Sequence, residues 1–170
     1  HAGDGRLMAE FARQKRVFVP IEAMPKQIIK AFLSAEDKTF YTHPGIDIPG
    51  IVRAMVTNVM RMGSNRRPIG ASTITQQVAK NFLLTNEVSI ARKAKEVILA
   101  LRIERAFTKD RILELYLNEI YLGFGSYGVA AAALNYFDKS LDELTLGETA
   151  FLAGLPKAPN NYNPVRRPQA

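Results

Sequence analysis

Residues 25–45 of this chain, PKQIIKAFLSAEDKTFYTHPG, decide which fold is expected. Pro25 suits the start of a helix, and the apolar residues after it recur at helical spacing: Ile28, Ile29, Phe32 and Leu33. The helix is expected to end at the acidic pair Glu36-Asp37, which is followed by aromatic residues, His43 and a turn. A carboxylate beside aromatic rings loses hydration and becomes a better proton acceptor. We therefore expect chemistry at this acidic pair.

Helical signals continue through the rest of the chain. Pro49 can start a helix whose apolar residues follow one face over residues 51–60. Ser or Thr residues then precede further stretches of helical spacing, where they can cap unpaired N–H groups: Ser72, Ser89, Thr108, Ser140 and Thr145. The last two have Glu three residues later, which completes a capping box. The pattern predicts a mainly α fold.

Residues 21–170 are expected to form one domain, and residues 1–20 a lead-in segment. Residues 6–12 and 16–20 alternate partly between apolar and polar, which is compatible with a short N-terminal hairpin. The polar first residues and the tail rich in Pro, Asn and Arg look like cuts through connecting segments. We therefore expect this chain to be a fragment of a longer protein.

Composition limits the class of protein. The 47% apolar content of 170 residues can fill the core of one domain. The absence of Cys excludes disulfides and thiolate zinc sites, and two His exclude a histidine-rich metal site. Apolar runs stay far below the roughly 18 to 20 residues that span a bilayer, so we expect no transmembrane helix and no signal peptide here. The net charge of +7 predicts an anionic partner, whether phosphate, nucleic acid or acidic lipid.

Basic and polar side chains gather on two further predicted helices. Arg92 and Glu96 share a helix face with Lys93 beside it, a pattern most often due to a solvated ion pair worth about 0.3 to 0.5 kcal/mol. Residues 70–81 place hydroxyls and backbone donors at a helix N-terminus, with Lys80 further along. Such a start favours anions, although a polar cap on a core helix explains it equally well.

In their order along the chain, these segments resemble the motifs of the peptidoglycan glycosyltransferases. This is glycosyltransferase family 51, the domain of class A penicillin-binding proteins and of monofunctional transglycosylases. The resemblance covers nearly the whole chain from about Arg6, in residues 36–45, 70–81, 92–96, 109–123, 127–128, 155–159 and 162–164. It implies a lysozyme-like helical domain with a small membrane-associated lobe. The implied activity is polymerisation of lipid II at the periplasmic face of the cytoplasmic membrane.

The resemblance also implies roles for particular residues. Glu36 matches the general base, which takes a proton from the GlcNAc 4-hydroxyl of the acceptor lipid II. That oxygen attacks C1 of the donor MurNAc, a β-1,4 linkage forms with inversion, and undecaprenyl pyrophosphate leaves. Glu96 matches a second essential carboxylate that orients basic groups or a divalent metal, Mg²⁺ or Mn²⁺, although no cofactor is expected to be required. Further positions match substrate-binding residues: Asp37, Phe40, His43, Ser72, Thr73, Gln76, Gln77, Lys80, Asn81, Arg92, Lys93 and Asn118.

For His43 a structural role is equally open, as a hydrogen bond that holds the Glu36 loop. The matches at Lys80, Arg92 and Lys93 are expected to surround the pyrophosphate. Many relatives carry another basic residue near Val88, where this chain has none. Arg66 and Arg67 are candidates to replace it, if their loop folds over the site.

The partners implied are lipid II, the growing glycan chain, an anionic membrane surface and a transpeptidase domain elsewhere in a membrane-anchored protein. This chain contains no Ser-x-x-Lys or Lys-Thr-Gly motif of a transpeptidase centre. The stripe over residues 51–60 packs partly inside, while Met55 and Met60 are expected to dip into lipid and Arg53 and Arg61 to meet acidic head groups.

Two alternatives remain on the sequence alone. A lysozyme-like muramidase or lytic transglycosylase would use a Glu as acid to break the same glycan, but its cleft needs no cluster of cations. A non-catalytic basic module would bind nucleic acid or membrane and would not need Glu36. No recognisable nucleic-acid motif is present, so we expect no nucleic-acid partner.

Overall fold

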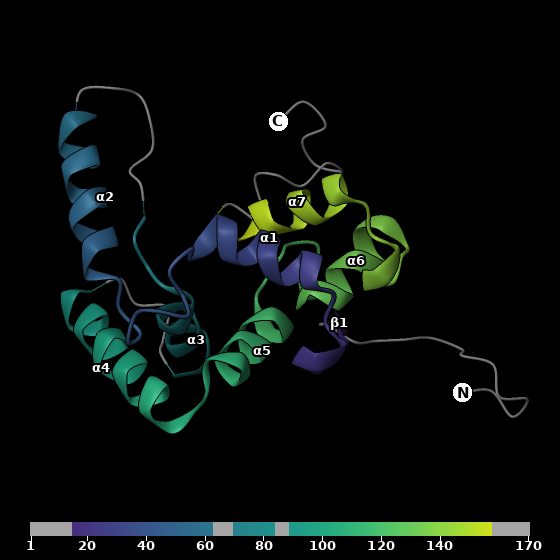
Figure 1. The fold of residues 1–170 in the computed structure, drawn as a ribbon, viewed down its shortest axis with the longest axis horizontal. Coiled ribbons are helices and arrows are strands. Elements are labelled where there is room, and N and C mark those ends of the chain that lie inside the picture. Colours follow the sequence, from purple (N-terminus) through teal and green to yellow (C-terminus); the bar gives the residue numbers. More distant parts are fainter. Residues whose placement is uncertain (1–14, 63–69, 84–88, 158–170) are drawn as a thin grey trace, which may run out of the picture.

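The structure is a computed structural model that describes residues 15–62, 70–83 and 89–157 (Figure 1). Helices dominate it, which confirms the mainly α prediction. The helices are α1 Lys26–Glu36, α2 Ile48–Met60, α3 Ile74–Leu83, α4 Ile90–Ala106, α5 Lys109–Glu119, α6 Val129–Phe137 and α7 Leu146–Gly154, with short 3₁₀ turns η1 Ile21–Ala23, η2 Leu141–Glu143 and η3 Leu155–Lys157. None of the helices in these ranges has the length and apolar character needed to cross a membrane.

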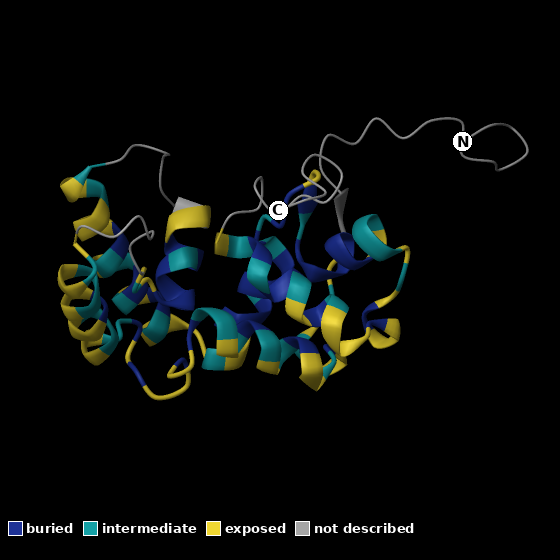
Figure 2. Ribbon diagram, turned by 90° about the horizontal axis from the view of Figure 1, so that it is seen from above, coloured by how far each residue is buried: buried dark blue, intermediate teal, exposed yellow. Residues whose placement is uncertain are grey.

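Helix α5 runs through the centre of the molecule. It contacts α3 and α4 on one side and α6 and η1 on the other, while α1 packs along α7. Four of its side chains are almost completely enclosed in the core: Ile112, Leu113, Tyr116 and Leu117. Figure 2 shows the buried residues gathered in the interior, with exposed residues at the edges. Through its contacts, α5 joins the part of the molecule that contains α3 and α4 to the part that contains α1, α6 and α7.

Helix α2 stands apart from this core at one side of the molecule (Figure 1). Ala54 is its one buried residue. The helix starts at Asp47, whose side chain accepts a hydrogen bond from the backbone N–H of Gly50 at 2.9 Å. Asp47 also accepts from Thr39 Oγ1 at 3.0 Å, so the start of α2 is fastened to the segment that follows α1.

The segment before α1 pairs differently from the predicted hairpin. Strand β1, Lys15–Arg16, lies parallel to β2, Ser126–Tyr127; residues 6–12, the other predicted arm, lie outside the described residues. The reason is a set of contacts with α5. Asn118 accepts from Val19 N at 2.7 Å and donates to Val19 O at 2.8 Å, which directs the chain along α5 toward β2. The boundary predicted between residues 20 and 21 stays a prediction.

The predicted caps are confirmed at four positions and wrong at one. Ser89, Thr108, Ser140 and Thr145 cap the elements that follow them. Ser72 does not cap α3. The capping residue is Thr73, whose Oγ1 accepts from Gln76 N at 3.2 Å while Gln76 Oε1 accepts from Thr73 N at 3.0 Å. Because α3 begins at Ile74, its N-cap position is Thr73, and Ser72 lies one residue too early to cap the helix.

Gly128 closes the turn after α5. Its φ is +82°, and a Cβ there would lie 2.4 Å from Asn118 O. Only glycine accepts both the left-handed backbone and this close approach without strain. The turn brings Tyr127 to the parallel pairing with Arg16.

We predict that Asn118→Ala lowers the free energy of unfolding by about 2 kcal/mol, because Val19 N–H and C=O would lose their partners in a partly buried place. Urea unfolding followed by circular dichroism measures this change. Asn81→Ala, at an exposed position of α3, is the control and should change stability by less than about 0.5 kcal/mol. A variant at 118 with full stability but impaired substrate binding would contradict the structural role and favour the substrate contact.

Candidate active site

Glu36 is the last residue of α1, and its two carboxylate oxygens differ in environment. Oε2 accepts a hydrogen bond from Gln77 Nε2 of α3 at 2.8 Å. Oε1 is buried and has no hydrogen-bond partner within the described ranges. Buried polar atoms are normally paired. An unpaired, buried carboxylate oxygen whose twin is held by an amide is therefore poised to accept a proton from a bound hydroxyl.

Asp37, the next residue, is buried and holds two elements together. Its Oδ2 accepts from Ile74 N, the first N–H of α3, at 3.0 Å. His43 Nε2 lies 3.0 and 2.9 Å from the two Asp37 oxygens. Because His43 Nδ1 accepts from Gly45 N at 3.0 Å, Nε2 carries the hydrogen and donates it to Asp37. The loop-holding hydrogen bond, one of the two roles considered for His43, is present.

The loop between α1 and α2 rests on three other helices. Thr73 Oγ1 donates to Gly45 O at 2.6 Å. Lys109 Nζ donates to His43 O and to Glu104 Oε1, each at 2.7 Å, and lies 4.6 Å from the centre of the Phe40 ring. Gly45 has a φ of +96°, and a Cβ there would lie 2.8 Å from Glu104 Cγ. The close packing fixes the loop that carries Asp37 and His43.

Arg92, Lys93 and Glu96 form a second group, at the start of α4. Glu96 is only 3% exposed, and its Oε2 accepts from Arg92 Nη1 at 3.1 Å while Oε1 accepts from Lys93 Nζ. Lys93 also donates to Ser72 Oγ at 3.0 Å. Since the carboxylate is buried between two cations, this is not a solvated surface pair. The group carries a net positive charge directed toward Ser72.

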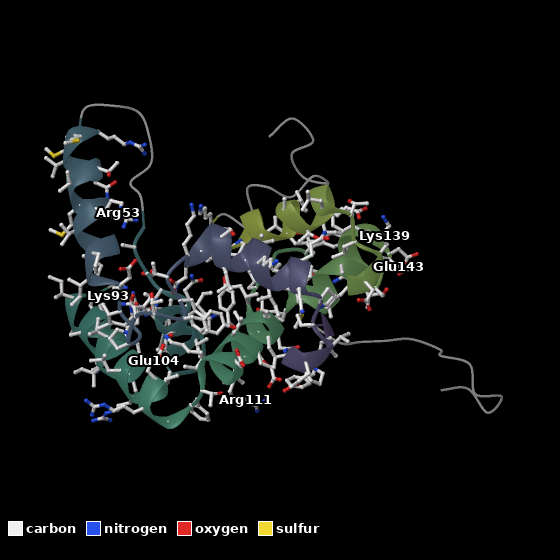
Figure 3. The ribbon with its side chains drawn as sticks, in the orientation of Figure 1. Arg53, Lys93, Glu104, Arg111, Lys139 and Glu143 are labelled. Carbon is white, nitrogen blue, oxygen red and sulfur yellow. The ribbon has the colours of Figure 1, made fainter. Side chains whose placement is uncertain are left out.

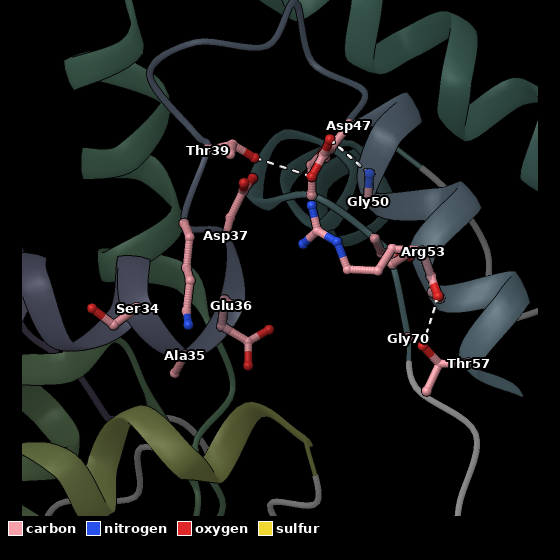
Figure 4. A pocket seen from close by; sticks show the side chains of 15 residues that line it. Ser34, Ala35, Glu36, Asp37, Thr39, Asp47, Gly50, Arg53, Thr57 and Gly70 are labelled. Atoms are coloured by element: carbon pink, nitrogen blue, oxygen red, sulfur yellow. Dashed lines mark hydrogen bonds between the residues drawn. The ribbon is translucent and has the colours of Figure 1, made fainter. Parts of the chain in front are cut away.

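A cavity of about 310 Å³ lies between the end of α1, the first turns of α2 and residues 70–73 (Figure 4). Four of the predicted catalytic and substrate-binding residues line it: Glu36, Asp37, Ser72 and Thr73. Two further residues contact this lining: Gln77 donates a hydrogen bond to Glu36, and Lys93 donates one to Ser72. The structure thus brings the acid of α1 and the cations of α4 to one cavity.

Other predicted site residues support the cavity or lie elsewhere. Phe40 is fully enclosed, with its ring against Tyr41 and His43. Gln76 is buried in the capping box of α3. Lys80 and Asn81 are exposed on the same helix. The side chain of Asn118 binds backbone atoms of Val19 and Glu114, whereas Arg66 and Arg67 lie outside the described residues.

Several cavity-lining residues were missed in the sequence. Ser34, Ala35, Asp47, Gly50, Ala54 and Thr57 belong to this group. Lys38, Thr39, Gly70 and Ala71 lie within the matched segments but had no role of their own, and Arg53 was expected at lipid head groups instead. The sequence did contain one signal, because Asp47 two residues before Pro49 is typical of a helix start.

The hydrogen bond from Gly50 N is the main cause that lowers the pKa of Asp47 below its ordinary value.

Tyr116 is a buried residue of α5 that is influenced by the charges of the two acids. Its hydroxyl is buried without a hydrogen-bond partner in the part of the chain that the structure describes. Burial, together with the charges of Glu36 and Asp37, raises the pKa of Tyr116 well above its ordinary value. The phenol therefore stays neutral.

The residues around Glu96 do not fit a divalent cation. Both of its oxygens face cationic side chains, whereas Mg²⁺ and Mn²⁺ need several oxygen ligands. Within the described ranges, no group of three or more acidic or His side chains is arranged to hold a metal. Glu96 is better suited to orienting Arg92 and Lys93.

In the part of the chain that the structure describes, a helical domain thus presents a buried carboxylate oxygen without a partner at the edge of a cavity, an arrangement suited to an enzyme that uses general acid–base catalysis. Residues 4–170 match the family model described as Transglycosylase, and the chain belongs to this family of enzymes.

Its relatives include several proteins named penicillin-binding protein 1A. The chain is 60% identical over 166 residues to that of Rickettsia felis, covering 98% of this chain and 21% of the relative. It is 53% identical over 165 residues to that of Haemophilus influenzae, covering 97% of this chain and 19% of the relative. The crystal structure of the Haemophilus protein aligns with a TM-score of 0.48 and 33% identity, over 95% of this chain and 14% of that one. The chain spans about a fifth of the length of these curated relatives.

We predict that Asp37→Ala lowers the free energy of unfolding by about 3 kcal/mol, because Ile74 N–H and His43 Nε2–H would both be left buried without an acceptor. Denaturant unfolding gives the value. Lys38→Ala, at the exposed neighbouring position, should stay within about 0.5 kcal/mol of the parent. Equal stabilities of the two variants would show that Asp37 does not hold the loop and α3 together.

Proposed function

We propose that this domain is a peptidoglycan glycosyltransferase that polymerises lipid II into β-1,4 glycan strands. The observation that carries the proposal is the Glu36 carboxylate at the cavity. Its Oε2 is held by Gln77, and its Oε1 is buried with no hydrogen-bond partner among the described residues. Membership of the transglycosylase family and similarity to proteins named penicillin-binding protein 1A support it.

In the proposed reaction, Glu36 is the general base. Oε1 accepts the proton of the acceptor 4-hydroxyl as that oxygen forms a bond to C1 of the donor sugar. The bond from C1 to the pyrophosphate oxygen breaks at the same time, on the opposite face, so the configuration inverts. Gln77 keeps the carboxylate in place by donating to Oε2. Proton transfer by a positioned side chain typically contributes about 10²- to 10⁴-fold.

The leaving pyrophosphate needs positive charge, which the start of α4 supplies. Lys93 and Arg92 are held by Glu96 before any ligand binds, so little reorganisation is needed as negative charge develops. Lys80 of α3 adds an exposed cation, and Ser72 adds a hydroxyl at the cavity wall. No metal ion is assigned to this step.

The cations also favour this reaction over its closest rival. A muramidase or lytic transglycosylase breaks a glycosidic bond whose leaving group is a sugar hydroxyl, which needs a proton rather than a set of cations. A buried acid that presents Arg92 and Lys93 is well suited to a pyrophosphate leaving group. A binding module without catalysis would have no need for the unpaired oxygen of Glu36.

We predict that Glu36→Gln lowers the rate of lipid II polymerisation by at least about 10²-fold, since an amide cannot take up the proton. Gel analysis of labelled glycan chains measures it. Circular dichroism should show an unchanged fold, and Glu22→Gln, at an exposed position of η1, should keep the parent rate. Polymer formation by the Gln variant at the parent rate would remove Glu36 as the base.

We further propose that α2 docks on the anionic outer surface of the cytoplasmic membrane. One of its faces is apolar and exposed, with these residues: Ile48, Val52, Met55, Val56, Val59 and Met60. The proposed substrate keeps its lipid tail in the bilayer, so the enzyme has to work at a membrane surface. The net charge of +7 favours a surface of acidic lipid. The proposed setting is the periplasmic side of a longer, membrane-anchored protein that also carries a transpeptidase domain.

Changing both Met55 and Met60 to Ser should reduce flotation with vesicles that contain anionic lipid by about ten-fold, because two apolar side chains no longer enter the bilayer. The matched control changes Phe124 and Leu146 to Ser. Both are also exposed but lie outside α2, so this variant should float like the parent. Unchanged flotation of the Met variant, with an intact fold, would contradict docking through α2.

A further inference from the structure

Helix α2 has two faces with different surroundings. Gly50, Arg53, Ala54 and Thr57 line the cavity, and their spacing of three, four and seven residues gathers them on one side of the helix. The exposed apolar residues occupy another side. At 3.6 residues per turn, Arg53 falls at the border between the two faces, close to the direction of Val56 on one side and Thr57 on the other.

The side chain of Arg53 is available for a ligand. It extends from α2 toward the side of the cavity that carries Glu36 and Asp37 (Figure 4). The hydrogen bond from Gly50 N is the main cause that lowers the pKa of Asp47, and the charge of Arg53 contributes to it. The Asp47 oxygens already accept hydrogen bonds from Gly50 N and Thr39 Oγ1. Among the described residues, no carboxylate forms a salt bridge with Arg53, whereas Arg92 and Lys93 are both paired with Glu96.

The cavity therefore has two separate sources of positive charge. One comes from α4, where Lys93 contacts the cavity wall through Ser72. The other is Arg53 of α2; Figure 3 labels the two cations on their different helices. Glu36 and Arg53 line the same cavity, and Lys93 contacts it through Ser72. A reaction that joins two diphosphate-linked sugars needs one cationic contact for each diphosphate, and the α4 group serves the one that leaves.

We propose that Arg53 binds the diphosphate of the acceptor substrate, an assignment that rests on the function proposed above. A lipid-linked diphosphosugar presents an apolar tail, a diphosphate and a sugar in that order. Helix α2 and the cavity present an apolar face, Arg53 and Glu36 in the same order. The guanidinium fork suits bidentate contact with phosphate oxygens. This differs from the head-group contact expected for Arg53 from the sequence.

The experiment separates the two substrates. A preformed lipid-linked oligosaccharide is the saturating donor, and lipid II is varied as acceptor in detergent without anionic lipid. Arg53→Gln should raise the acceptor KM about ten-fold, while kcat and the donor KM stay within about two-fold. The acceptor KM of Arg53→Lys should lie between those of Arg53→Gln and the parent, because lysine keeps the charge but lacks the two-pronged guanidinium. Arg105→Gln, exposed on α4 and outside the cavity lining, should match the parent.

A second acceptor tests the contact itself. With a disaccharide-peptide that lacks the diphosphate, the parent and Arg53→Gln should react equally slowly, because the phosphate contact is absent from both.

An unchanged acceptor KM in a folded, polymerising variant would overturn the assignment. So would a rise confined to the donor KM, or an effect seen only with anionic vesicles, which would mark Arg53 as a lipid head-group contact. Failure of the parent protein to make polymer from lipid II would instead remove the proposed function, and the assignment with it.

Discussion

The arrangement of this site depends on one buried carboxylate, that of Asp37. It accepts the first N–H of α3 and the Nε2–H of His43, so it joins the end of α1, the following loop and the start of α3. Glu36 precedes it in the chain, and Gln77 lies one turn into α3. The distance of 2.8 Å between the Glu36 carboxylate and the Gln77 amide therefore depends on Asp37, although Asp37 takes no part in the proposed proton transfer.

Two acids farther from Glu36, the buried Glu96 and the half-buried Glu104, act in a related way. Glu96 is enclosed with Arg92 and Lys93, and Glu104 accepts from Lys109 and from Thr75. Burying a carboxylate is costly unless cations or hydrogen bonds compensate it. Glu96 is compensated by cations of its own helix, and Glu104 by groups outside α4. Each carboxylate therefore holds its partners in fixed positions. Positive charge near the cavity is thereby fixed before a ligand arrives.

Much of the fold could be predicted from local patterns, because caps and helical spacing act within a few residues. Ser89 and Thr108 are examples. The parallel pairing of Lys15–Arg16 could not, since it depends on Asn118 binding the backbone of Val19, 99 residues away. The motifs predicted that Glu36 and the α4 cations belong to one site. They did not indicate that Arg53 lines the same cavity, because that follows from the angle at which α2 leaves the loop.

The attachment of α2 explains how a helix proposed to dock on a membrane can matter to the chemistry. Ala54 is its one buried residue, so packing holds it weakly and its direction is set mainly at its first turn. There Asp47 caps the helix and also accepts from Thr39, three residues after Glu36. The same loop is fixed by Asp37 on its other side. A change in the tilt of α2 would thus move one wall of the cavity while Glu36 stays in place. The proposed acceptor contact at Arg53 would then change before the surroundings of the Glu36 carboxylate do.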